Sequence, residues 1–236
     1  MSLEIVQVYQ SLLGIYGDQG NGKVLQKRCE WRGIDAHVTW IEPGQPLPDT
    51  GDIFLLGGGE DGAQTAAVRE LKADGGLHRA VDRGAVVFAV CAGYQILGHT
   101  FGVGDADEPR EGLGLLDVTT TRGPQRAVGE VLHRWIGKEG DDAWITGFEN
   151  HGGYTHIGRD AMPLARVEVG VGNANDGSEG ALQGNVVGMY PHGPVLPRNP
   201  AIADWLLELA LGHDLDPLDL PLHDELRRHR LAAVRG

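Results

Sequence analysis

The sequence of 236 residues predicts a single-domain α/β protein, with a mainly parallel or mixed sheet flanked by helices. Two observations lead to this prediction. In the first half, short apolar runs alternate with helical segments at the spacing of βαβ units, whose strands pair in parallel. The 37 glycines gather at the ends of the apolar runs, where an α/β protein turns its backbone and binds ligands.

The individual elements follow from these patterns. Strands are predicted over residues 3–13, 36–41, 52–56 and 85–90, and helices over 23–32 and 61–83, the second interrupted at Gly75-Gly76. Beyond about Gly112 the pattern changes to short strands over 115–121, 128–135, 143–148, 165–171 and 186–190, with antiparallel or mixed pairing. An amphipathic helix over 199–211 ends the predicted domain (1–212). Residues 213–236 form a polar, loosely attached tail that favours a short helix over 222–234.

Composition excludes several classes of protein. With 41% hydrophobic and 22% charged residues, the chain can bury one sizeable core. No apolar run approaches the roughly 18 residues of a membrane helix, and the first residues lack a basic region, so we expect a soluble, cytoplasmic protein without membrane insertion. The net charge of −13, without a basic stripe, argues against nucleic-acid binding. The two cysteines, Cys29 and Cys91, stand in unlike surroundings, which favours free thiols over a disulfide.

Cys91 lies where the most apolar predicted strand, residues 85–90, meets the start of a helix. A sharp strand-to-helix turn exposes the side chain and surrounds it with free backbone N–H groups. The positive end of the helix dipole favours the thiolate over the thiol, and Gly93 allows a substrate to approach the backbone. We therefore predict that Cys91 is a catalytic nucleophile rather than a buried structural cysteine.

A run of three glycines, residues 57–59, closes the neighbouring predicted strand. It should lie beside Cys91, because the carboxyl ends of parallel strands share one edge of the sheet. The N–H groups of Gly59 and Ala92 could there stabilise the oxyanion that forms when a thiolate attacks a carbonyl. The alternative for the glycine run is a plain tight turn.

A cysteine nucleophile needs an imidazole that moves protons. Among ten histidines, His192 follows an apolar strand directly and lies between Pro191 and Pro194. His151, within residues 148–153, is the rival base on the residues alone.

The segment from Cys91 to Gln95 resembles the C-x-G-x-Q elbow of class I glutamine amidotransferases, which have a flavodoxin-like fold. Classical members carry a glutamate two residues after the histidine; here that position is Pro194, which resembles the cobyric acid synthase-like branch. Within this branch, four ordered segments, residues 16–21, 57–61, 147–153 and 190–194, resemble the GatD family. The resemblance covers about residues 3–211. Glu60 departs from it, since many relatives carry glutamine there.

The resemblance implies roles for several residues. It makes His192 the base rather than His151, and Arg126 the residue that binds the α-carboxylate of glutamine, because a guanidinium pairs bidentately with a carboxylate. Arg122 is the competitor for that role. The remaining implied residues belong to the architecture of the site: Gly58, Gly93, Gln95 and His151.

The resemblance also implies a reaction and a partner. GatD proteins hydrolyse L-glutamine and deliver ammonia to MurT, a Mur-ligase-like subunit that binds ATP and lipid II and amidates the D-glutamate of the stem peptide to D-isoglutamine in peptidoglycan synthesis. The absent glutamate leads to a further hypothesis, that the partner subunit supplies the group that orients His192 and that hydrolysis therefore depends on assembly.

Two other features have simpler interpretations. Residues 17–23 fit the first seven positions of a phosphate-binding loop, but Val24 stands where Ser or Thr would hold Mg²⁺, and Lys23 is expected to be solvated. Cys29 is expected to be a packing residue. No cluster of cysteine, histidine and aspartate has metal-ligand spacing, so we expect no metal and no cofactor.

Two alternative functions stay open on the sequence. One is a stand-alone cysteine hydrolase of the DJ-1/PfpI type; those proteins place a histidine directly after the nucleophile, whereas this chain has Ala92. The other is a non-catalytic scaffold subunit that has kept the motifs without the activity.

Overall fold

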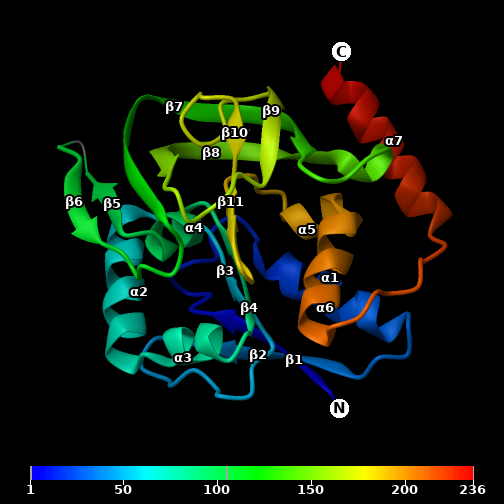
Figure 1. Cartoon of the computed structure of the whole chain (residues 1–236), viewed down its shortest axis with the longest axis horizontal. Helices are drawn as coiled ribbons and strands as arrows, with labels where there is room; N and C mark the ends of the chain where they lie inside the picture. Colours follow the sequence, from blue (N-terminus) through cyan, green and yellow to red (C-terminus); the bar gives the residue numbers. More distant parts are fainter. Residues whose placement is uncertain (1, 105, 236) are drawn as a thin grey trace.

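The computed structural model describes residues 2–104 and 106–235. The chain forms two six-stranded sheets (Figure 1). The central sheet has the order β11-β12-β4-β3-β1-β2 and helices on both faces. The second sheet has the order β10-β9-β7-β5-β6, with β8 paired to β7. The predicted α/β fold is confirmed, and the second sheet accounts for the change of pattern in the second half of the sequence.

The central sheet positions the candidate site. Its parallel strands are β1 (Leu3–Val8), β2 (Ala36–Ile41), β3 (Ile53–Leu56), β4 (Val86–Val90) and β12 (Val186–Met189), with β11 (Ala181–Gln183) antiparallel at one edge. Every residue of β3, β4 and β12 is buried, as expected for parallel strands covered on both faces. The carboxyl ends of these three strands therefore meet at one edge.

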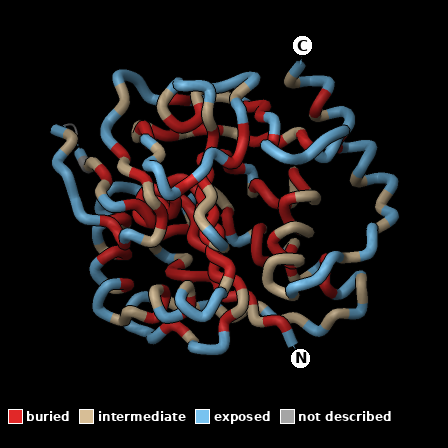
Figure 2. The backbone as a smooth tube through the Cα atoms, in the orientation of Figure 1, coloured by how far each residue is buried: buried red, intermediate tan, exposed pale blue. Residues whose placement is uncertain are grey.

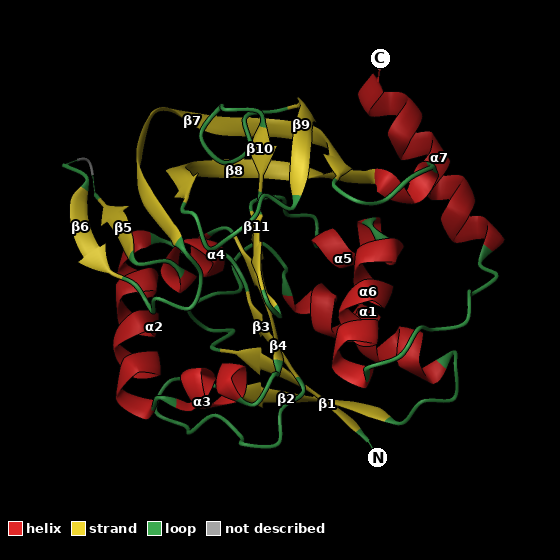
Figure 3. Cartoon of the chain, in the orientation of Figure 1, coloured by secondary structure: helices red, strands yellow, loops and turns green. Residues whose placement is uncertain are grey.

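Helices cover the two faces of the central sheet (Figure 3). On one side lie α1 (Gln19–Glu30), α5 (Val195–Arg198) and α6 (Pro200–Leu211); on the other lie α2 (Asp61–Asp74) and α3 (Gly76–Asp82). The predicted interruption at Gly75 is confirmed, because this residue ends α2 in a left-handed conformation with φ of 66°. The short helix α4 (Ala92–Leu97) follows β4 directly. The buried residues gather between the central sheet and its helices (Figure 2).

The second sheet differs in detail from the sequence prediction. It consists of β5 (Thr100–Val103), β6 (Glu108–Glu111), β7 (Val118–Trp135), β8 (Trp144–Ile157), β9 (Ala165–Val169) and β10 (Ser178–Glu179), with a 3₁₀ turn (Asp141–Ala143) before β8. The two strands predicted over 115–121 and 128–135 are one long strand, β7. Its pairing with β8 resumes after an irregularity between Arg122 and Ala127, so the glycine-containing segment does not end the strand.

The C-terminal residues form α7 (Pro221–Arg235), which confirms the predicted helix. Its Arg227 is buried and donates hydrogen bonds to the backbone carbonyls of Arg198, Asp141 and Trp144. These contacts hold α7 against α5 and the ends of β7 and β8. The domain boundary after residue 212 stays a prediction. No helix within the described residues has the length and apolar character needed to cross a membrane.

Candidate active site

Cys91 occupies the sharp turn between β4 and α4. Its backbone has φ of 53° and ψ of −106°, a strained conformation for a residue with a side chain. Two hydrogen bonds hold the turn: the N–H of Cys91 donates to the carbonyl of Met189, and the N–H of Gly93 donates to that of Gly57. The predicted strand-to-helix turn is confirmed, but its exposure is not: Cys91 is only 6% exposed, although it lines a cavity.

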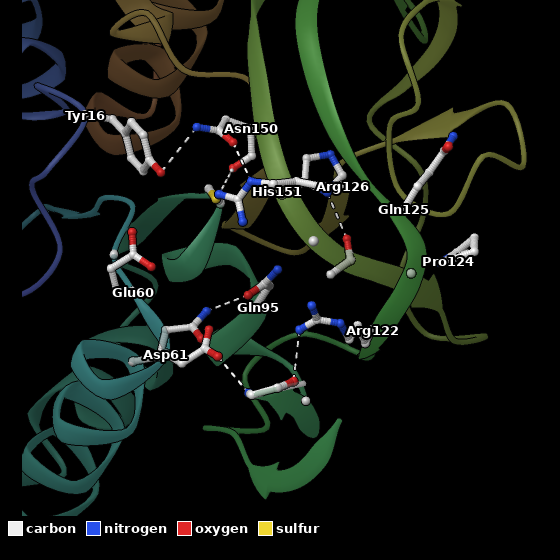
Figure 4. Close-up of a pocket in the computed structure, with 18 residues that line it drawn as sticks. Tyr16, Glu60, Asp61, Gln95, Arg122, Pro124, Gln125, Arg126, Asn150 and His151 are labelled. Atoms are coloured by element: carbon white, nitrogen blue, oxygen red, sulfur yellow. Dashed lines mark hydrogen bonds between the residues drawn. The ribbon is translucent and has the colours of Figure 1, made fainter. Parts of the chain in front are cut away.

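The cavity has a volume of about 360 Å³, within the range typical of small-molecule sites. It lies between the carboxyl edge of the central sheet and the second sheet (Figure 4). Five residues that the sequence singled out line it together with Cys91: Gly59, Gln95, Arg122, Arg126 and His151. Other lining residues, which the sequence had not assigned to the site, include Tyr16, Glu60, Asp61 and Gln64. Asn150, expected like its neighbour His151 to belong to the architecture of the site, lines the cavity as well.

His192 is 3% exposed and does not line the cavity, but it lies beside Cys91. Two backbone hydrogen bonds join it to Phe148 of β8, at 2.9 and 3.0 Å. On the other side it lies against the glycine run, where a Cβ on Gly58 would come within 2.7 Å of the His192 Cε1. Only glycine permits this approach, so β8 and the loop after β3 clamp the imidazole in place.

Asp18 and Tyr16 complete the surroundings of His192, and neither role was predicted. The Oδ1 of Asp18 lies 3.4 Å from the His192 Nδ1, and its Oδ2 accepts a hydrogen bond from the N–H of Gly58 at 2.7 Å. The Tyr16 ring packs on the imidazole with centroids 4.3 Å apart. Burial would lower the pKa of His192, but its interactions with Asp18 and Cys91 outweigh burial and raise that pKa to about 9.

His151, the rival base, is engaged elsewhere. Its ring stacks on Tyr190 with centroids 3.6 Å apart. One ring nitrogen lies 2.8 Å from the carbonyl oxygen of Gly153, and the other lies 3.5 Å from a carboxylate oxygen of Glu149. Both nitrogens thus face oxygen acceptors, an arrangement that fixes the ring in the cavity wall.

Arg126 lies in the irregular segment of β7 between Arg122 and Ala127, where the regular pairing with β8 is interrupted. Its guanidinium donates to the Asn150 Oδ1 at 2.7 Å, and the Asn150 amide donates in turn to the Tyr16 hydroxyl. Arg122 also lines the cavity, but it holds the β5–β6 hairpin: its N–H donates to the Asp107 carboxylate and its guanidinium to the Gly104 carbonyl. The structure therefore gives the two arginines different surroundings.

Gln95 and the two cysteines have simple local explanations. The Gln95 side chain accepts a hydrogen bond from Gln64 and donates one to the Tyr190 hydroxyl, linking α2, α4 and the end of β12. Both cysteines are free thiols, as predicted. Burial of Cys29 in α1 raises the pKa of its thiol to about 11, which fits a packing residue. Among the described residues, no group of three or more cysteines, histidines or acids could hold a metal ion.

The fold is that of class I glutamine amidotransferases. A solved glutamine amidotransferase from Thermotoga maritima superposes with a TM-score of 0.56 over 100% of this chain and 96% of its own, at 15% identity. Residues 4–200 match the model of the CobB/CobQ-like glutamine amidotransferase domain. The chain therefore belongs to the CobB/CobQ-like glutamine amidotransferase family.

Two relatives match along nearly the whole chain. The GatD subunit of lipid II isoglutaminyl synthase (glutamine-hydrolysing) from Staphylococcus aureus is 38% identical over 99% of this chain and 96% of its own length. The subunit of the same name from Streptococcus pneumoniae is 32% identical over 98% of this chain and 89% of its own. The resemblance read from the four sequence segments is confirmed.

Proposed function

We propose that this chain is the glutamine-hydrolysing subunit of a lipid II isoglutaminyl synthase, with Cys91 as nucleophile and His192 as its acid–base partner. The observation that carries the proposal is the strained Cys91 turn on the wall of a cavity, with His192 held beside it. The names of the two relatives supply the reaction.

In the first half of the reaction the Cys91 thiolate attacks the side-chain carbonyl carbon of glutamine. The resulting oxyanion accepts hydrogen bonds from the N–H groups of Gly59 and Ala92. Gly58 is not a candidate donor, because its N–H already donates to Asp18. The His192 imidazolium protonates the leaving nitrogen, the C–N bond breaks, and ammonia leaves a thioester on Cys91.

The second half requires the opposite proton transfer. Neutral His192 takes a proton from water, the hydroxide attacks the thioester, and glutamate and free Cys91 result. The charge of Cys91 contributes to the raised pKa of His192. Thioester formation removes that charge, so the pKa of His192 falls and the ring becomes a better base when one is needed.

Charges on opposite walls of the cavity match the two ends of a free amino acid. Arg126 extends from the β7 side and Glu60 from the start of α2 (Figure 4). The Arg126 guanidinium would pair with the α-carboxylate of glutamine, and the Glu60 carboxylate with its α-ammonium group. Glu60 is the residue at which the sequence departs from many relatives, and it keeps a polar group at this position.

Replacing Arg126 with alanine should raise the KM for glutamine by about 10- to 100-fold, because one charge-assisted contact to the substrate is lost. The kcat should change less, since this contact forms in the ground state as well as in the transition state. Steady-state kinetics of Arg126→Ala and Arg122→Ala would compare the two arginines. A larger KM effect at Arg122 would assign the α-carboxylate to that residue instead.

The proposal also covers the acceptor of the ammonia and the partner subunit that binds it. Making an amide from a carboxylate needs ATP. The segment that resembles a phosphate loop lacks the Mg²⁺-binding hydroxyl, and its Asp18 lies against His192 instead. We propose that a MurT-like Mur-ligase subunit binds ATP and lipid II, receives the ammonia and amidates D-glutamate. Amidation of lipid II by the purified pair with glutamine and ATP, and by neither chain alone, tests this; amidation without this chain would contradict it.

A glutamine-mimicking chloroketone tests the glutaminase itself. Mass spectrometry after treatment should locate the label on Cys91, and excess glutamine should block it. Labelling that glutamine does not affect would favour a stand-alone hydrolase, and a Cys91 that cannot be labelled would favour a non-catalytic subunit.

A further inference from the structure

Asp18 occupies the N-cap position of α1, but its side chain makes no capping hydrogen bond to the helix. Aspartate at the N-cap position commonly accepts a hydrogen bond from the first turn of its own helix. Here the side chain makes no such bond and turns toward the site, although Asp18 is the N-cap residue. It is 1% exposed, so its carboxylate is held in a buried position by the contacts it makes there.

We propose that Asp18 is the positioning residue for His192, holding the proton on Nδ1 so that Nε2 can exchange a proton with Cys91. The inference rests on the proposed glutaminase function and deepens it. It also places the orienting carboxylate in this chain, before α1, rather than in the partner subunit or at the position of Pro194. Buried carboxylates fix the tautomer and orientation of catalytic imidazoles in this way.

The geometry assigns the two ring nitrogens different roles. Nδ1 lies 3.4 Å from the Asp18 Oδ1. Nε2 is buried and has no hydrogen-bond partner among the described oxygen and nitrogen atoms. The groups placed against the ring are Asp18 and Tyr16 from the turn before α1, Cys91 after β4, and Gly58 in the loop after β3. Asp18 is thus the carboxylate that meets the ring.

The second carboxylate oxygen of Asp18 contacts the glycine run, residues 57–59. By accepting the Gly58 N–H at 2.7 Å, it fixes the peptide next to Gly59, the proposed oxyanion donor. One carboxylate therefore sets the position of the base relative to the oxyanion site. Its two partners are 40 and 174 residues away in sequence, so only the folded chain brings them together.

The substitution Asp18→Asn separates the contact with His192 from the contact with Gly58, because asparagine has nearly the same size and shape as aspartate. The asparagine oxygen can still accept the Gly58 N–H, whereas its NH₂ group would donate to Nδ1 and move the histidine proton to Nε2. We expect kcat for glutamine to fall by about 10²- to 10⁴-fold with KM changed less than about threefold. Asp35→Asn, an exposed aspartate before β2, is the matched control and should behave as the parent protein.

Alkylation of Cys91 by iodoacetamide, followed against pH, gives a readout that needs no glutaminase activity. Loss of the Asp18 carboxylate should weaken the imidazolium beside Cys91, so Asp18→Asn should need a higher pH than the parent protein for the same rate of alkylation. An unchanged alkylation profile with kcat within threefold of the parent would overturn the positioning role. If the parent protein hydrolyses no glutamine but Asp18→Asn shifts the alkylation profile to higher pH, the proposed function fails while the contact between Asp18 and His192 is supported.

A measurement that leaves Asp18 intact covers the case in which the variant does not fold. In Cys91→Ala protein labelled with ¹⁵N-histidine, the NMR signals of the neutral His192 ring should show its proton on Nδ1, because Asp18 remains as the acceptor. A neutral ring with its proton on Nε2 would contradict the inference.

Discussion

Glutamine hydrolysis should fall by at least about 10³-fold when Cys91 is replaced with serine. The proposed mechanism pairs a Cys91 thiolate with the His192 imidazolium, and burial, Asp18 and Cys91 together set the pKa of this imidazole at about 9. A serine hydroxyl does not ionise at that pH, so it cannot form the ion pair and is a poor nucleophile without a stronger base. Steady-state ammonia release measures the loss.

Cys29→Ala is the matched control for this variant. Cys29 is the other free thiol, buried in α1 with its pKa raised to about 11, and it is not among the residues that line the cavity. The control should keep hydrolysis and chloroketone labelling, whereas Cys91→Ser should lose both with an unchanged circular dichroism spectrum. More than a tenth of the parent activity in Cys91→Ser would rule out Cys91 as the nucleophile.

The rate at which the parent protein releases ammonia from glutamine should also depend on pH. Formation of the thioester uses the protonated ring of His192, so the rate of the first half-reaction should decline as pH rises through about 9. Single-turnover release of ammonia between pH 7 and 10 measures this decline. A rate that keeps rising to pH 10 would show that His192 is not the acid.

The position of Cys91 could be predicted because local sequence determines it. Five buried residues of β4 end at a cysteine followed by Ala92 and Gly93, and a parallel sheet brings the ends of β3 and β12 to the same edge. His192 was selected because it follows an apolar strand directly, as Cys91 does, and because the resemblance made it the base. The strand before it was predicted in the region of antiparallel or mixed pairing, whereas β12 pairs in parallel with β4 in the central sheet. The same reasoning placed Gly59 on the cavity wall.

Asp18 could not be predicted, for the opposite reason. Its partner His192 is 174 residues away, and a single carboxylate in a turn has no periodicity that points to a catalytic contact. The surrounding glycines moreover suggested a phosphate loop. The short strands β5, β6, β10 and β11 have two to four residues each, too few for an alternating pattern. The long strand β7 was predicted as two strands, because its irregular segment between Arg122 and Ala127 contains glycine and proline, which are typical of turns.

A second pair of ionisable residues lies buried beneath the site and determines a pH effect on stability. Glu179 of β10 is fully buried, and one of its oxygens accepts the N–H of Tyr190, at the end of β12. The other oxygen makes no hydrogen bond among the described residues and lies 4.0 Å from a ring nitrogen of His133. Burial, with the nearby negative charge of Glu149, raises the pKa of Glu179 to about 8.

His133 does not turn this pair into a salt bridge. Burial lowers the pKa of His133 to about 4, so near neutral pH both the histidine and Glu179 are uncharged in the folded protein. In the unfolded chain Glu179 ionises at about 4.5. Its contribution to stability is therefore fully present below about 4.5 and is lost as pH rises toward about 8, because the unfolded state releases a proton that the folded state retains.

Glu179→Gln should remove this loss, since glutamine is neutral in both states and its oxygen can still accept the Tyr190 N–H. Relative to the parent protein, the variant should gain on the order of 3–5 kcal/mol of unfolding free energy between pH 5 and pH 8. That gain corresponds to a difference in Tm that grows by about 5 °C or more over this interval. The effect of His133 cancels in the comparison, because both proteins contain it.

Thermal unfolding at several pH values measures the difference between the two proteins. Glu168→Gln, at an exposed position of β9, is the control and should leave the difference in Tm independent of pH. A difference for Glu179→Gln that stays constant from pH 5 to 8 would mean that Glu179 is ionised in the folded state throughout. In that case His133 would have to be its charged partner, and the strand end that leads to His192 would be held by a buried salt bridge instead of by two neutral side chains.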